Sequence, residues 1–163
     1  MTQSPMIDRR SALAAAGAAF AVSGVPAAAR GADSHPAAAR EAEALVDRYV
    51  AAWSAKDLAA LRAVTSDDVL FVSPTAKSEG REAYLAAAQR FFPLYSKLAL
   101  RARLAGPEQA MIAYDLDCLP PIGRCPTAEL LTLRDGRIAA SQIYFDARPF
   151  EVLMRAAQPK PAQ

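Results

Sequence analysis

One carboxylate of the sequence stands within an apolar run on a predicted strand. Glu129 follows Ala128 and precedes Leu130 and Leu131. Burial of a carboxyl group without a neighbouring cation raises its pKa, so the group can stay protonated and donate a proton. The sequence therefore predicts Glu129 as a general acid or hydrogen-bond donor, with a purely structural role as the alternative.

Two further carboxylates, Asp115 and Asp117, are candidates for a proton acceptor. Both lie on one face of a predicted strand, because side chains alternate with period two. The alternating Ile112, Tyr114 and Leu116 favour the opposite face as the one that meets the core. The aspartates are then solvated or salt-bridged, whereas a register shifted by one residue turns them into a pocket, where they can accept a proton.

Metal, dinucleotide and nucleic-acid sites are not indicated. The 163 residues include one histidine, His35, and two cysteines, too few for a zinc or iron site. No glycine-rich turn joins a strand to a helix, as a dinucleotide site requires. The formal net charge is +2 and the basic residues are not clustered, which argues against binding to nucleic acid. We therefore expect no cofactor and no metal.

The two cysteines flank a short loop between two predicted strands. Six residues separate Cys118 from Cys125. Opposed positions on adjacent antiparallel strands bring Cβ atoms close enough for a disulfide, so we predict one here. This pairing also places Tyr114 opposite Glu129. Redox catalysis is the alternative, although the spacing is not that of a C-x-x-C motif.

Residues 1–29 have the three parts of an export signal in the correct order. Arg9 and Arg10 precede the apolar residues 12–22, and small residues at 25–29 offer cleavage positions. The segment resembles a twin-arginine signal peptide, which implies the twin-arginine export machinery as a partner and a periplasmic or secreted protein. The apolar stretch is too short to span a bilayer, so we expect no stable membrane insertion. The alternative is an Ala-rich tail with a chance arginine pair.

The remaining chain divides into a linker, one folded domain and a tail. Residues 30–39 show no periodicity and predict a linker, residues 40–155 predict the domain, and residues 156–163 predict a disordered tail. Within the domain, the helical period indicates a helix from about residue 38 to residue 55, and Asp57 can cap a second, short helix. A turn is predicted at residues 66–68, a loop at 75–80, and a third helix begins at Arg81 and bends or ends at Pro93.

Strands follow the helices along the chain. Short β-rich or alternating segments predict strands at residues 69–73, 97–104, 111–118, 127–133 and 138–145. Asp135 and Gly136 form a dipeptide typical of a hairpin turn. Helices first and antiparallel strands later predict an α+β domain in which the helices cover one face of the sheet.

This order of elements, together with several local phrases, resembles the nuclear transport factor 2-like superfamily in its SnoaL-like and ketosteroid-isomerase-like branches. The phrases are residues 48–53, 56–58, 66–69, 134–138 and 143–146, and the resemblance covers about residues 41–150. It implies a cone-shaped, curved antiparallel (mixed) sheet covered by three N-terminal helices, as in a cystatin-like roll. It also implies a pocket at the wide end of the cone, and a homodimer formed through the open face of the sheet.

The resemblance also assigns site residues by position. The tyrosine of the ketosteroid-isomerase site falls on Tyr49, its protonated acid on Glu129 and its base on Ser73. A serine cannot serve as that base without a histidine to activate it, so the steroid-isomerase mechanism is not predicted. The same positional match turns Asp115 and Asp117 inward, against the apolar alternation. The expected pocket lining is Trp53, Phe71, Ser73, Tyr84 and Leu131.

Two functions are compatible with these residues. The first is an exported pocket protein for a small apolar molecule, in the form of an isomerase, cyclase or dehydratase that uses Tyr49, Glu129 and one aspartate for acid–base chemistry. The second is a non-catalytic ligand-binding or homodimeric interaction module. Which polar side chains share one cavity distinguishes the two.

Overall fold

The structure is a computed structural model that describes residues 35–156. The predicted signal peptide, residues 30–34 of the predicted linker and residues 157–163 of the predicted tail lie outside the described residues. Three helices precede most of the strands, and the order of elements is α1 (His35–Ala55), α2 (Leu58–Val64), β1 (Thr65–Val72), β2 (Lys77–Glu79), α3 (Arg81–Phe91), the 3-10 helix η1 (Phe92–Leu94), β3 (Tyr95–Ala105), β4 (Gln109–Cys118), β5 (Arg124–Arg134), β6 (Arg137–Phe145) and α4 (Arg148–Ala156).

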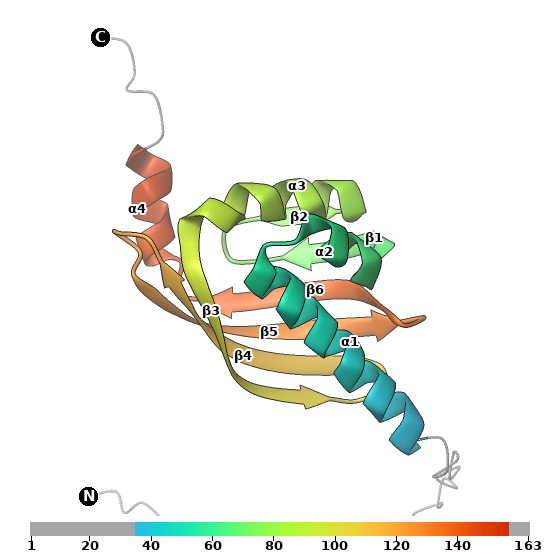
Figure 1. Ribbon diagram of the computed structural model, residues 1–163. Helices are drawn as coiled ribbons and strands as arrows, with labels where there is room; N and C mark the ends of the chain where they lie inside the picture. Colours follow the sequence, from blue (N-terminus) through green and yellow to red (C-terminus); the bar gives the residue numbers. More distant parts are fainter. Residues whose placement is uncertain (1–34, 157–163) are drawn as a thin grey trace, which may run out of the picture. The chain divides into compact units, whose positions relative to one another are not determined.

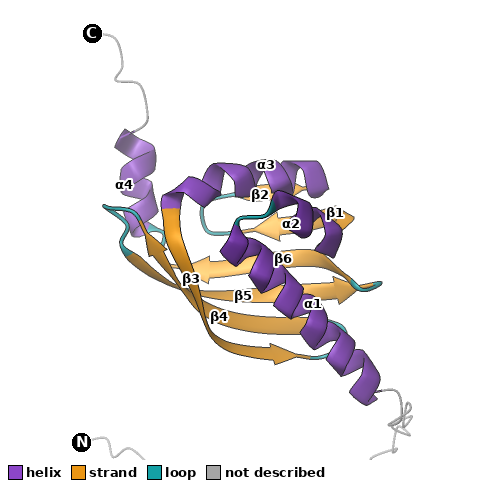
Figure 2. Cartoon of the chain, viewed as in Figure 1, coloured by secondary structure: helices purple, strands orange, loops and turns teal. Residues whose placement is uncertain are grey.

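One curved sheet contains all six strands, in the order β2-β1-β6-β5-β4-β3. The pairing of β1 with β6 is parallel and the other four pairings are antiparallel. Figure 1 shows α1 crossing one face of the sheet, with α2 and α3 beside β1 and β2. The helices thus cover one face and leave the other uncovered by described helices (Figure 2), which confirms the predicted α+β class with a mixed, curved sheet.

Local sequence signals account for most element boundaries. The Asp57 carboxylate accepts hydrogen bonds from the backbone N–H groups of Ala59 and Ala60, both at 2.9 Å, so it caps α2 as predicted. Asp135 and Gly136 have φ values of 53° and 67° in the β5–β6 turn, the left-handed conformation of the predicted hairpin type. Pro93 lies in η1, directly after α3 ends.

Several element boundaries differ from the prediction. Helix α1 begins at His35, so residues 35–39 are helical instead of linker; Pro36 suits a first turn, and the alanines that follow favour a helix. Residues 66–68 belong to β1 and not to a turn. Their carboxylates Asp67 and Asp68 point to solvent and form ion pairs with Arg81 and Arg134.

Two further differences are elements that the prediction missed. Strand β2 lies within the expected loop at residues 75–80 and pairs with the end of β1. Helix α4 occupies the end of the described chain and includes Ala156, the first residue of the predicted tail. Its Phe150 is buried and packs against Phe145 with ring centroids 4.9 Å apart, which attaches α4 to β6.

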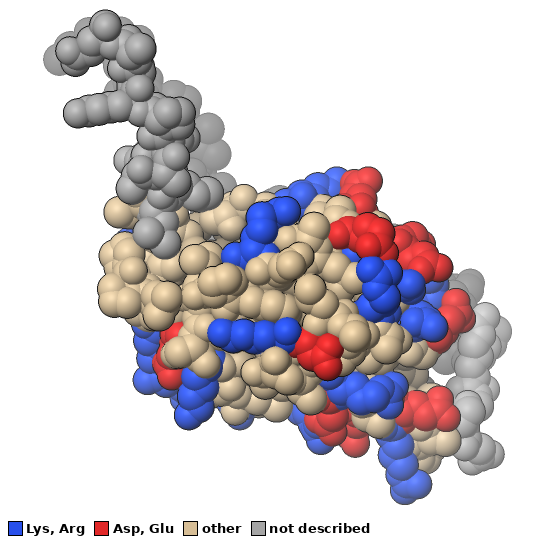
Figure 3. All heavy atoms as spheres, turned by 45° about the horizontal axis from the view of Figure 1, so that its top comes forward, with Lys and Arg blue, Asp and Glu red and all other residues tan. Residues whose placement is uncertain are grey.

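The core lies between α1, α3 and the covered face of the sheet. Helix α1 contributes Leu45, Val46 and Tyr49 at helical spacing, and the sheet contributes Ile112 and Leu131. On the face in Figure 3, acidic and basic side chains are interleaved around a broad uncharged region. Among the helices described for residues 35–156, none has the length and apolar character needed to cross a membrane.

Candidate functional site

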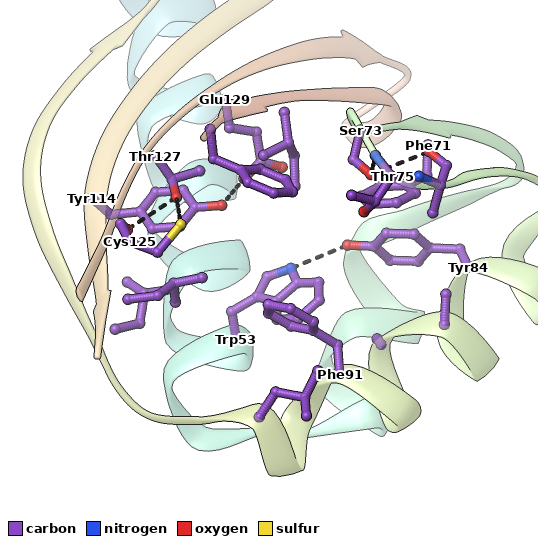
Figure 4. Close-up of a pocket in the computed structure, with 18 of the residues that line it drawn as sticks. Trp53, Phe71, Ser73, Thr75, Tyr84, Phe91, Tyr114, Cys125, Thr127 and Glu129 are labelled. Carbon is purple, nitrogen blue, oxygen red and sulfur yellow. Dashed lines mark hydrogen bonds between the residues drawn. The ribbon is translucent and has the colours of Figure 1, made fainter. Parts of the chain in front are cut away.

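A cavity of about 400 Å³ opens between the covered face of the sheet, α1 and α3. This volume is typical of small-molecule sites. Most of its wall is apolar and aromatic, and Trp53 and Phe91 project into it in Figure 4. The main apolar lining residues are Trp53, Phe71, Phe91, Ile112, Phe145 and Phe150.

Glu129 is the only Asp or Glu residue among the described residues that line this cavity. Its side chain is 2% exposed and accepts three hydrogen bonds. The hydroxyls of Tyr49 and Ser141 donate to Oε1, both at 2.7 Å, and the hydroxyl of Tyr114 donates to Oε2 at 3.0 Å. Three elements besides β5 therefore converge on one carboxyl group: α1, β4 and β6.

The hydrogen bonds continue from Tyr49 toward Trp53. The hydroxyl oxygens of Tyr49 and Tyr84 are 3.0 Å apart, and the indole N–H of Trp53 donates to the Tyr84 hydroxyl at 3.1 Å. Because the Tyr49 hydrogen is directed at Glu129, the Tyr84 hydroxyl must be the donor to Tyr49. The chain of donors thus runs from Trp53 through Tyr84 and Tyr49 to the carboxyl group (Figure 4 shows the link from Trp53 to Tyr84).

Burial raises the pKa of Glu129 above its usual value, and the hydrogen bonds from Tyr49, Ser141 and Tyr114 oppose this shift only in part. The pKa values of Tyr49 and Tyr114 are raised well above the usual value, mainly by burial and secondly by repulsion from Glu129. The tyrosines therefore stay neutral. When Glu129 is protonated, the carboxyl group and its three hydroxyl donors hold one hydrogen more than the hydrogen bonds among them require. This hydrogen can be donated to a ligand in the cavity.

Asp115 and Asp117 lie on the other face of the sheet. Strand β4 turns Tyr114 and Leu116 toward the cavity and the aspartates away from it. Asp115 is buried beneath two arginines: the Arg101 guanidinium is 2.8 Å from its Oδ2, and Arg124 forms an ion pair with the same oxygen. Hydrogen bonds from Arg124 and then Arg101 lower the pKa of Asp115.

This geometry corrects the prediction that one of these aspartates is the proton acceptor. The apolar alternation of β4 determines the register, because turning the aspartates inward would expose three apolar side chains and bury two carboxylates. Asp117 is exposed, and neither aspartate lines the cavity.

Ser73 lines the cavity, but its hydroxyl is occupied in the turn between β1 and β2. It accepts from the backbone N–H groups of Thr75 and Ala76 at 3.3 and 3.0 Å, and donates to the Ala76 carbonyl at 3.2 Å. Trp53, Phe71 and Tyr84 also line the cavity, as expected. Leu131 does not: it is 0% exposed and belongs to the continuous core, two residues beyond Glu129 on the same face of β5.

Sequence reasoning missed two of the three donors to Glu129. The apolar alternation of β4 predicts a core position for Tyr114 without a polar role, and the sequence pattern predicts no role for Ser141. Ser141 is 1% exposed at a position of β6 where an apolar residue would be expected. A small polar residue at a core-facing strand position is a detectable signal, because buried hydroxyls need a partner.

The predicted disulfide is not formed. Both cysteines are free thiols, and the pairing of β4 with β5 places Cys125 opposite Leu116. The two cysteines are therefore diagonal neighbours, a separation that is too large for a disulfide without movement of the backbone. The same register places Thr127, not Glu129, opposite Tyr114. Burial raises the pKa of both thiols, that of Cys118 to about 11, which disfavours the reactive thiolate.

Within the described chain, no group of three or more His, Cys, Asp or Glu side chains is arranged to hold a metal ion. The cavity instead combines an apolar wall with one carboxyl group, three tyrosine hydroxyls, one indole N–H, one guanidinium group and the hydroxyls of Ser73, Thr75 and Thr127. This arrangement can hold an apolar molecule and direct one hydrogen-bond donor at it. Tyr49 and Glu129 are brought together as predicted, and their catalytic role stays a prediction.

Comparison with known proteins places the chain among domains of this shape. The sequence profile of the SnoaL-like domain matches residues 46–141. A protein from Kribbella flavida is 27% identical and superimposes with a TM-score of 0.65, covering 71% of this chain and 95% of that chain. No curated protein sequence matches significantly.

Two less similar structures share the fold. A nuclear transport factor 2-like protein of unknown function from Cytophaga hutchinsonii is 20% identical, with a TM-score of 0.61 and coverage of 68% of this chain and 94% of that chain. A steroid delta-isomerase from Pseudomonas aeruginosa is 16% identical, with a TM-score of 0.60 and coverage of 71% and 87%.

Proposed function

Because the chain belongs to the SnoaL-like domain family, we propose that its cavity binds a small, largely apolar molecule and that protonated Glu129 donates a hydrogen bond to an oxygen of that molecule. The observation that carries this proposal is a carboxyl group, 2% exposed, in the wall of an apolar cavity with three hydroxyls directed at it. Burial keeps its pKa raised, which favours the protonated form that the hydrogen bond requires.

The geometry favours binding over acid–base catalysis. An isomerase, cyclase or dehydratase needs a group that accepts a proton as well as one that donates it. Among the described residues that line the cavity, Glu129 is the only carboxylate, and Ser73 is committed to its turn. Any proton transfer would therefore pass through Glu129, with Tyr114 or Tyr49 supporting an oxyanion.

Two probes that differ by one oxygen test the role of Glu129. We would compare 2-acetylnaphthalene, whose carbonyl only accepts hydrogen bonds, with 2-ethylnaphthalene, and follow binding by fluorescence of Trp53, the single tryptophan of the chain. A net neutral hydrogen bond is worth about 1 kcal/mol, or about a fivefold preference for the ketone. We expect that preference at low pH, where Glu129 is protonated, and its decrease as pH rises through the raised pKa of Glu129.

Matched variants identify the group responsible. Glu129→Gln keeps an uncharged donor at the same place, so its preference for the ketone should not change with pH. Glu108→Gln, at an exposed position outside the cavity, should behave like the wild type. A preference that is equal at all pH values in the wild type, or absent, contradicts the proposal.

We also propose that the mature protein is exported to the periplasm or secreted, and that it forms a homodimer. Export rests on Arg9, Arg10 and the apolar and small residues that follow them, all of which lie outside the described residues. The homodimer rests on apolar side chains on the uncovered face of the sheet.

A further inference from the structure

One cation lines the cavity that holds Glu129. Arg90, on the last turn of α3, contributes to the wall and is exposed, so it lies where the cavity meets solvent. Arg90 and Glu129 are the only Asp, Glu, Lys, Arg or His side chains among the described lining residues. Within residues 36–152, Arg90 has no carboxylate partner within 4.0 Å, a property that it shares with Arg40, Arg48 and Arg137.

The cavity therefore has two chemically different ends. One end holds the buried Glu129 with Tyr114 and Thr127, and the other reaches the exposed Thr75 in the loop between β1 and β2. Figure 4 shows Thr75 and Ser73 on the side of the cavity opposite Tyr114 and Cys125. Trp53 and Phe91 line the cavity between these two sides.

From this polarity we propose that the ligand is an apolar monoanion, whose carboxylate or sulfonate pairs with Arg90 at the entrance while its uncharged oxygen reaches Glu129. This inference rests on the proposed function and specifies its ligand class. Guanidinium groups bind such anions through a planar fork of N–H donors. Because Arg90 is exposed, an ion pair with it stays partly hydrated, so its formation carries little desolvation cost and contributes only modestly to affinity.

The reverse orientation is disfavoured by the charges of the cavity. An anionic group beside Glu129 would be buried and would meet a carboxyl group, whereas Arg90, the one cation among the described lining residues, is exposed to solvent. Burial of an unpaired charge is strongly unfavourable. Glu129 therefore selects the uncharged end of the ligand and Arg90 the charged end.

Two dyes that differ by one sulfonate test this inference. 8-Anilinonaphthalene-1-sulfonate is the anion, and N-phenyl-1-naphthylamine is the same molecule without the sulfonate. Energy transfer from Trp53 to the dye reports binding in the cavity, because Trp53 lines it and is the only tryptophan. Competition by 2-acetylnaphthalene confirms the location. The full-length mature chain is used throughout.

We expect Arg90→Gln to weaken binding of the sulfonate dye by about twofold to fivefold, the range of exposed ion pairs, and to leave the uncharged dye unaffected. Arg90→Glu should weaken the sulfonate dye further, and Arg90→Lys should restore most of the binding. Arg48→Gln is the matched control, because Arg48 is exposed on α1 and does not line the cavity.

The outcomes separate this inference from the proposed function. If both dyes respond alike to the Arg90 variants, or if Arg48→Gln has the same effect as Arg90→Gln, the inference is wrong while the cavity remains a binding site. If neither dye nor 2-acetylnaphthalene binds the wild type, the proposed function fails and the inference fails with it.

Discussion

Glu129 accepts hydrogen bonds from Tyr49, Ser141 and Tyr114, yet burial still raises its pKa. The outcome follows from the competition between two effects. Desolvation penalises the charged carboxylate, whereas each donated hydrogen bond favours it. Because desolvation is the larger effect here, the folded protein holds the proton of Glu129 more tightly than the unfolded chain does.

This difference makes stability depend on pH in a predictable direction. The stabilisation from the bound proton is complete below the unfolded pKa of Glu, about 4.3, and is lost as pH rises through the higher folded pKa. Gln cannot ionise. The melting temperature of the wild type should therefore fall relative to Glu129→Gln as pH rises from about 4 to about 8. Scanning calorimetry across this range measures the difference.

The comparison between the two proteins cancels the titration of all other groups. Glu108→Gln, an exposed position, serves as the control and should run parallel to the wild type. A constant difference in melting temperature between wild type and Glu129→Gln across the range would show that Glu129 ionises with the same pKa in the folded and unfolded states.

At the scale of elements, strand β4 decides which carboxylates can take part in the site. Its alternation directs Ile112, Tyr114 and Leu116 to the covered face and places Asp115 beneath Arg101 and Arg124 on the other. The pairing of β4 with β5 then sets Ile112, not Tyr114, opposite Glu129. Tyr114 reaches Glu129 diagonally, within the range that a long aromatic side chain can span.

The N-terminal segment is a separate element of the sequence, and its prediction concerns export. If Arg9 and Arg10 form a twin-arginine signal, replacement of both by Lys should block translocation and retain the precursor in the cytoplasm of a bacterium with this export system. Cell fractionation with immunoblotting measures the distribution. Arg30→Lys, beyond the expected cleavage positions, is the control. Equal export of the Lys pair and the wild type would contradict the prediction.

At the scale of the whole molecule, the uncovered face of the sheet exposes a row of apolar side chains. Register places Leu104 opposite Met111 and Met111 opposite Leu130 across three strands. Leu104 is 75% exposed, and Tyr144 on β6 is 47% exposed. Contiguous exposed apolar surface of this kind marks interaction sites.

We expect a second copy of the chain to cover this face, which would give a homodimer. Leu104→Glu should shift the protein toward the monomer, because it places a charge in the row of apolar side chains that the second copy would cover. Light scattering coupled to size-exclusion chromatography measures the mass. Leu119→Glu is the matched control, since Leu119 is exposed in the loop between β4 and β5. A wild type that is monomeric at all concentrations, or a dimer unaffected by Leu104→Glu, would refute the expectation.

Local patterns determined the α+β class, the cap of α2 by Asp57, the turn at Asp135 and Gly136, and the burial of Glu129. Each depends on neighbours within a few residues, through helical or strand periodicity, side-chain hydrogen bonds and backbone conformation. For the same reason, the local pattern extended β1 too little, since pairing with β6 and partners such as Arg134 support the start of this strand.

The tertiary structure decided the membership of the site. Tyr49 and Glu129 are 80 residues apart, and the donors Tyr114 and Ser141 reach the same carboxyl group from two other strands. Strand register, which depends on how complete faces pack, excluded Asp115 and Asp117, separated Cys118 from Cys125 and moved Leu131 into the core. The packing of α3 also places Arg90 in the wall of the cavity that contains Glu129. The sequence could not predict this, because no local pattern relates one turn of α3 to the middle of β5.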